Sequence, residues 1–156
     1  MADPEHEASL RKSWRTRWLG SLEELGDIAM QRATWLNPAN SNPHYSYVEY
    51  RECYFTDLDL SDGYSPLVAD GYVSNAEAEA VEPFHRLFKA YGTPTGDSYD
   101  HAAILADLRW LEIADAARAA ADRLADLLAY PEELRHLRER SPSALQAAMT
   151  ANGTPT

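Results

Sequence analysis

The sequence has a single cysteine, Cys53, only two lysines, and no long apolar run. One cysteine excludes an internal disulfide framework and fits a reducing compartment. Because no extended apolar stretch is present, we expect neither a secretory signal nor a membrane span, and we expect a cytosolic protein. The seven glycines are scattered singly, which excludes a glycine-rich phosphate loop.

Basic residues are scarce relative to acids, and the imbalance is local. The formal net charge is −11, and residues 21–112 hold sixteen acids but five bases, while both flanking regions are nearly neutral. This composition argues against direct nucleic-acid binding, because affinity for a phosphate backbone comes mostly from clustered Lys and Arg. A basic protein is the natural partner of such a field. The alternative is that a pI near 4.8 serves solubility alone.

Helix-capping signals and apolar residues at helical spacing recur along the chain. They predict one all-α domain over residues 1–156, an irregular bundle of five to six main helices with mobile tails at about 1–6 and 150–156. A further short turn is expected at Ser141 and Pro142. The predicted helices span residues 7–19, 22–36, 42–58, 65–71, 74–91 and 99–129, with another starting at Pro131.

Two capping boxes set helix starts in this prediction. Ser21 with Glu24 is expected to open the second helix after Gly20 closes the first, so that the two form a hairpin. Ser74 with Glu77 opens the fifth, and Pro83 inside that helix removes one backbone hydrogen bond.

Residues 42–60, NPHYSYVEYRECYFTDLDL, combine aromatic rings with carboxylates. We expect a helix here, capped by Asn42, whose rings cover more than one face and therefore remain partly exposed. Tyrosines beside acids suit a binding surface, because the ring buries area while the acids attract Lys or Arg. The predicted partner-binding residues are Tyr45, Tyr47, Glu49, Tyr50, Glu52, Asp57, Asp59, Asp62, Tyr64, Asp70, Tyr72, Glu77 and Glu79. The alternative is that these rings fill the core.

The leading functional hypothesis is a small acidic binding protein that sequesters a basic protein. An immunity protein or antitoxin fits best, since carboxylates would occupy the place of phosphates on a nucleic-acid-acting enzyme. This hypothesis involves no cofactor, no direct nucleic-acid contact and no membrane. The sequence leaves the oligomeric state open.

Other chemistry is less well supported by the spacing. Glu82 and His85 have the Glu-x-x-His spacing of di-iron bundles, and with Glu49 and Glu52 in the interior they would form a helical metal- or ligand-binding enzyme. Such sites need two pairs together with further inward-facing glutamates, and Glu49 with Glu52 comes without a histidine at the matching spacing, which weakens this alternative. A third possibility is an oligomeric scaffold subunit that uses the alanine-rich face near residues 114–121.

Two further motifs fail on their details. Cys53 with His44 and Asp57 contains the parts of a nucleophilic site, but acidic surroundings raise a thiol pKa, so a structural cysteine is expected. The run FTDLDLSDG departs from a calcium loop, because Asp62 stands where glycine is required.

Overall fold

The computed structural model describes residues 3–138, and this part of the chain is all-α, with no strand. The predicted all-α class is therefore confirmed, while several helix boundaries differ from the predicted ones. The expected turn at residues 141–142 and the tail at 150–156 lie outside the described residues. The elements are α1 (Pro4–Gly26), α2 (Ile28–Trp35), α3 (Tyr47–Glu52), the π-helix η1 (Cys53–Asp57), α4 (Ser65–Ala69), α5 (Asn75–Ala90), α6 (His101–Ala106), α7 (Leu108–Ala125) and α8 (Pro131–Arg138).

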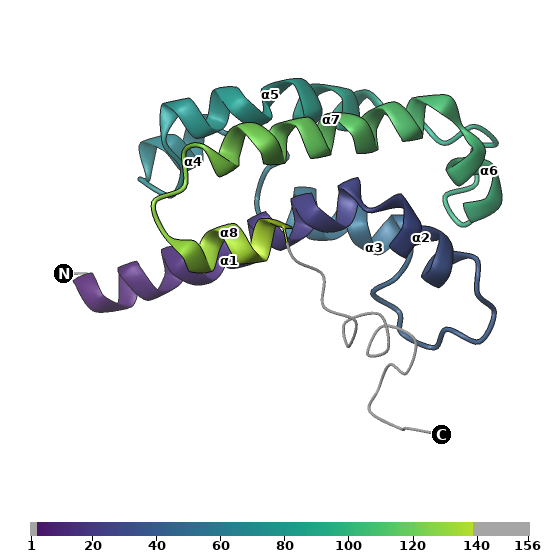
Figure 1. Cartoon of the computed structure of the whole chain (residues 1–156), viewed down its shortest axis with the longest axis horizontal. Helices are drawn as coiled ribbons and strands as arrows, with labels where there is room; N and C mark the ends of the chain where they lie inside the picture. The colour runs from purple at the N-terminus through teal and green to yellow at the C-terminus, as the bar shows by residue number, and fades with distance from the viewer. Residues whose placement is uncertain (1–2, 139–156) are drawn as a thin grey trace.

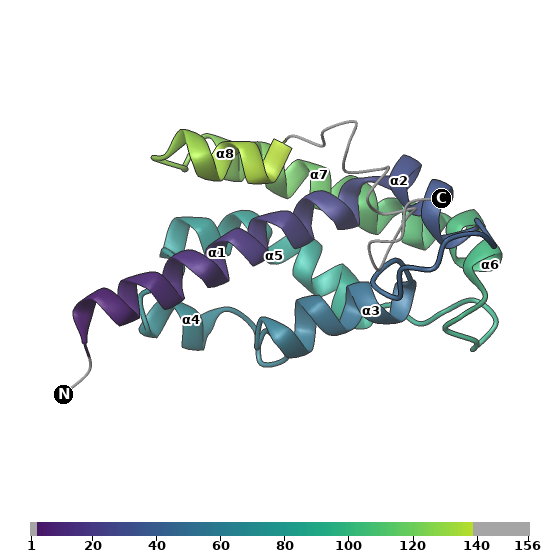
Figure 2. The ribbon, with the colours of Figure 1, turned by 90° about the horizontal axis from the view of Figure 1, so that it is seen from below.

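Helices α5 and α7 lie side by side, and α1 packs against the other side of α7 (Figure 1). Helix α8 returns to pack along α1, and α3 and α4 lie along one side of the molecule (Figure 2). This arrangement brings α1, α5 and α8 together although they are far apart in the sequence.

Helix α1 is one continuous helix, so the predicted break at Gly20 and the hairpin that depended on it are wrong. It starts with Asp3 accepting a hydrogen bond from the backbone of Glu5, and it includes residues 4–6, which were expected in a mobile tail. Ser21 is buried inside the helix and caps nothing. The chain bends about two turns later, where Asp27 ends α1 and accepts from Met30 N at 3.0 Å to start α2.

The alanine-rich stretch of α7 packs inside the molecule. A Cβ added at Gly26 would lie 2.9 Å from Cγ of Arg118 and 3.5 Å from the backbone oxygen of Ala114, so α1 and α7 approach closely here. Ala114 and Ala117 are fully buried. The small residues of this stretch allow α1 to approach closely, and because Ala114, Ala117, Ala120 and Ala121 are buried in the fold, they are not available for the expected oligomer contact.

The aromatic segment starts its helix later than predicted. Residues 42–46 form side-chain-capped turns, in which Asn42 accepts from His44 N at 3.1 Å, and Ser46 caps α3 by accepting from Glu49 N at 3.1 Å. The helix then continues as η1, and Asp59 follows with φ of 57°. The wider π turn places Tyr54 and Phe55 together in the core.

The capping box of α5 is confirmed, with Ser74 Oγ accepting from Glu77 N and Glu77 accepting from Ser74 N. Pro83 lies inside this helix as predicted. The predicted 99–129 helix is divided, because Asp107 is extended and caps α7 through Arg109 N at 3.1 Å. The core between these helices is rich in rings, including Trp18, Phe84, Phe88 and Trp110.

Candidate functional site

The structure places most of the predicted interface tyrosines in the core. Tyr47, Tyr50 and Tyr64 are 3%, 2% and 4% exposed, while Tyr45 and Tyr72 are half-buried. The expectation that these rings lie on the surface is wrong for the three buried ones, because α1, α5 and α7 supply ring and aliphatic partners for them. The predicted interface carboxylates, in contrast, lie mostly on the surface.

Seven of the eight predicted carboxylates are exposed. They are Glu49, Glu52, Asp57, Asp59, Asp62, Asp70 and Glu79. Within residues 3–138, none of the seven forms a salt bridge. Arg51 is the one Lys or Arg in residues 42–82, and its guanidinium lies over the rings of Phe55 and Phe88 at 4.7 and 5.6 Å, while His44 pairs with Glu24 outside this segment. The acids of this segment are therefore not neutralised by its own base.

Glu77 is the exception, and it is buried. Arg15 donates to both of its oxygens, at 3.0 and 2.7 Å, and also bonds both oxygens of Glu133. Burial opposes ionisation of Glu77, but hydrogen bonds from Arg15 and Ser74 outweigh it and lower the pKa of the carboxyl. This network ties α1, α5 and α8 together, so Glu77 has a structural role and is not a contact for a partner.

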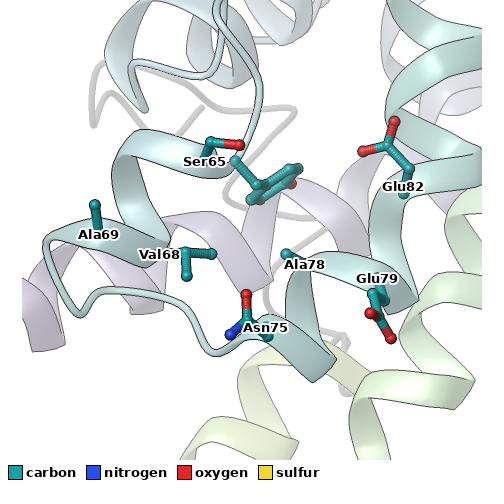
Figure 3. A pocket seen from close by; sticks show the side chains of 8 residues that line it. Ser65, Val68, Ala69, Asn75, Ala78, Glu79 and Glu82 are labelled. Atoms are coloured by element: carbon teal, nitrogen blue, oxygen red, sulfur yellow. The ribbon is translucent and has the colours of Figure 1, made fainter.

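A groove lies between α4 and α5, next to the exposed acids (Figure 3). It consists of two adjoining cavities, of about 370 and about 500 Å³, that share Tyr64, Ser65 and Glu82. The smaller cavity is lined by α4 on one side and by α5 on the other. Its further lining residues are Val68, Ala69, Asn75, Ala78 and Glu79.

His85 lies in the wall of the larger cavity and is 4% exposed. Its Nδ1 is 2.8 Å from the Tyr54 hydroxyl, which is 2.8 Å from the Tyr64 hydroxyl, and the latter accepts from Trp18 Nε1 at 2.9 Å. Since the indole can only donate, every hydroxyl proton finds an acceptor when Tyr64 donates to Tyr54 and Tyr54 donates to His85.

This order of donors fixes the proton of His85 on Nε2. Burial is the main cause of a lowered pKa for His85, with Lys89 adding to it and Glu82 opposing it, so the ring is neutral at pH 7. Within the described residues, Nε2 has no hydrogen-bond partner. The buried ring therefore presents one unused N–H donor to the groove.

The structure also brings Cys53 and His44 together, but the acid beside them is Glu24 and not Asp57. His44 Nε2 is 2.7 Å from Glu24 Oε2, and the imidazole also hydrogen-bonds the Cys53 thiol. These two bonds outweigh burial and raise the pKa of His44 to about 10. A protonated imidazole cannot serve as a general base, so the cluster acts as an ion pair that joins α1 to the start of the aromatic segment.

No group of three or more His, Cys, Asp and Glu side chains in residues 3–138 is arranged to hold a metal ion. Of the four residues expected in the interior of a metal- or ligand-binding enzyme, only His85 is buried, while Glu49, Glu52 and Glu82 are exposed. That interior arrangement is therefore wrong. No helix in the same part of the chain is both long and apolar enough to cross a membrane.

Sequence reasoning missed Arg15, Ser65 and Asn75. Nothing in the sequence indicated that Arg15 would reach Glu77, because only tertiary packing brings the side chain from α1 to the one from α5.

Comparison with protein-family models, with curated protein sequences and with solved structures finds no match for this chain.

Proposed function

We propose that this protein binds a basic protein partner through an acidic surface made of the exposed carboxylates between residues 49 and 82. The role that this surface supports best is that of an immunity protein or antitoxin, which covers the phosphate-binding site of a nucleic-acid-acting enzyme in the cytoplasm. The acidic surface consists of Glu49, Glu52, Asp57, Asp59, Asp62, Asp70, Glu79 and Glu82.

The observation that carries this proposal is the run of eight exposed acids without a salt bridge between residues 49 and 82, a stretch whose only Lys or Arg is Arg51. Some acids elsewhere in the described chain form salt bridges, as Glu24, Asp115, Glu132 and Glu133 do, while others, such as Glu5, Glu112 and Asp126, form none. The eight carboxylates of the acidic surface form none in that part of the chain, although they are close in sequence. Unpaired like charges destabilise the folded protein by mutual repulsion, and a cationic partner relieves that repulsion.

The burial of the tyrosines changes how such a surface binds. A partner would meet charges at the rim of the molecule and would not bury a set of exposed rings. Rim charges act mainly on the rate of encounter, so we expect an association rate that falls as salt screens the field.

A defined probe tests this proposal. A fluorescent peptide of alternating glycine and arginine is titrated with the protein at about 50 and about 200 mM salt, a range over which screening is strong. The test variant neutralises three acids of the acidic surface, as Glu49→Gln, Asp57→Asn and Glu79→Gln. The control variant removes the same charge from exposed acids elsewhere, as Glu5→Gln, Glu112→Gln and Asp126→Asn.

The test variant is expected to bind the peptide at least about tenfold more weakly, because each removed acid takes away a charge-assisted contact. The control variant should change affinity by less than about threefold, through net charge alone. Equal losses in the two variants would show that binding follows overall charge, and the proposal would then be wrong.

A further inference from the structure

We infer that the groove between α4 and α5 receives a single Arg or Lys side chain of the partner, whose neighbouring main-chain carbonyl accepts a hydrogen bond from His85 Nε2. This inference rests on the proposed function and identifies the specific pocket within it.

The smaller cavity matches the two parts of a basic side chain. Val68, Ala69 and Ala78 provide apolar wall for the methylene stem. Glu79 and Glu82 line the α5 side with their carboxylates turned toward opposite ends of the groove, so the cationic head can pair with one of them at either end (Figure 3). Long basic side chains bind in this way, with the stem on apolar surface and the charge among acids. Its volume of about 370 Å³ admits one such side chain.

The two carboxylates have no cation of their own. Glu79 and Glu82 are three residues apart on α5, so they project from the same side of the helix. Within residues 3–138 neither forms a salt bridge. Two bases lie nearby on α5: Arg86, which lines the larger cavity with Glu82 and forms no salt bridge in that part of the chain, and Lys89, which donates to the carbonyl oxygen of Ser61 at 2.9 Å.

The second observation is His85, which is independent of the acids. Its ring is buried, its Nδ1 is occupied by Tyr54, and its Nε2 lacks a partner in the described structure while the ring lines the groove. Although the ring is buried, Nε2 is not among the buried atoms that lack a partner, so it is open to the groove and a ligand carbonyl can take the place of water there. The Tyr64 and Tyr54 hydroxyls hold the ring in the tautomer that makes this donation possible.

The larger cavity defines the direction of the ligand. Arg86 and Lys89 line it together with His85, so a cationic head is disfavoured at that end. The basic side chain therefore lies toward Glu79, and the acceptor groups of the chain lie toward His85. Asp62 and Glu82 also line this cavity, and their two negative charges offset the positive charges of Arg86 and Lys89, so that a peptide with a cationic side chain is not repelled.

The experiment uses a short peptide, acetyl-Gly-Arg-Gly-amide, and its citrulline counterpart, which has the same shape without the charge. The peptides are titrated into the ¹⁵N-labelled full chain while the backbone amides of residues 62–86 and the His85 Nε2–H are followed by NMR. The arginine peptide is expected to shift these signals and to move the Nε2 proton downfield. The citrulline peptide should bind at least about tenfold more weakly.

Variants separate this pocket from the wider surface. Glu79→Gln with Glu82→Gln should weaken the arginine peptide at least about tenfold, while Glu49→Gln with Glu52→Gln should change it by less than about threefold. Equal binding of the two peptides, or equal effects of the two variant pairs, overturns the pocket. If the long polybasic peptide still loses affinity when acids of the acidic surface are neutralised, the proposed function survives that failure.

Discussion

Glu77 and Glu79 lie two residues apart on α5, yet their side chains have different surroundings. Glu77 is buried, its carboxylate accepts two hydrogen bonds from Arg15 and one from Ser74 N, and its backbone N donates to Ser74 Oγ to complete the capping box of its helix. Glu79 is exposed and lies at the groove without a salt bridge in the described chain. One glutamate therefore stabilises the fold, whereas the other is free to bind a cation from outside.

This comparison shows that formal charge is a poor guide to function until pairing is known. An acid that already has a cation contributes little to an external field, because its partner cancels it at short range. The acids that matter for a partner are those that the fold leaves unpaired.

Arg15→Ala should destabilise the protein by about 3 kcal/mol or more, because it leaves the buried Glu77 without its cation and releases Glu133 of α8. Urea denaturation measures the loss of unfolding free energy. The matched control is Lys12→Ala on the same helix, whose pair with Glu132 at 3.7 Å is exposed and should cost about 0 to 1 kcal/mol. Similar losses in both variants would remove the structural role given to Glu77.

Tyr54→Phe should cost about 1 to 3 kcal/mol, because the lost hydroxyl leaves Tyr64 without an acceptor and His85 Nδ1 without a donor. The imidazole should then lose its fixed tautomer, which ¹⁵N chemical shifts of the ring report. Tyr45→Phe is the control, since Tyr45 is half-buried and has no hydroxyl hydrogen bond in the described structure. A wild-type His85 already protonated on Nδ1 would contradict the assigned order of donors.

His44 gives the molecule a pH dependence of definite sign. Its pKa of about 10 in the fold exceeds the ordinary 6.5, so the folded state binds this proton more tightly than the unfolded state. The stabilisation is complete below about pH 6.5 and is lost as the pH rises through about 10. Unfolding free energies of the wild type and of His44→Asn should converge over this range. A constant difference between them from pH 6.5 to 10 would contradict the ion pair with Glu24.

Glu79→Gln with Glu82→Gln should leave the unfolding free energy within about 0.5 kcal/mol of the wild type, since exposed acids without ion pairs add little to stability. Thermal and urea unfolding check this, with Glu77→Gln as the comparison within the same helix. Glu77→Gln should be the more destabilising, because Arg15 then loses a charged partner. A large loss in the double variant would mean that these acids serve the fold.

Local signals predicted the fold class and the start of α5, because capping residues and apolar spacing act within a few residues of one another. They failed at Gly20, where tertiary packing of α1 on α7 overrides a glycine and a capping serine that would otherwise end and restart the helix. They failed again at residues 42–46, where Asx turns, rather than a helix, satisfy the backbone.

The candidate site was harder to predict than the fold. The exposure of Glu49 and Asp57 followed from their charge, but the burial of Tyr47 and Tyr64 depends on which helices cover them. The sequence around a tyrosine looks the same whether its hydroxyl contacts water or, as in Tyr64, accepts a hydrogen bond from a buried indole. The groove itself depends on how α4 packs beside α5, and no local spacing encodes that contact.

The most direct test of the acidic surface is to map where a basic probe binds. The glycine-arginine peptide is added to the ¹⁵N-labelled chain at low salt, and the amide shifts are followed residue by residue. The account predicts shifts concentrated in residues 49–65 and 75–89 that fade as salt is raised. Shifts of equal size along α7 and α2, or shifts that ignore salt, would contradict it.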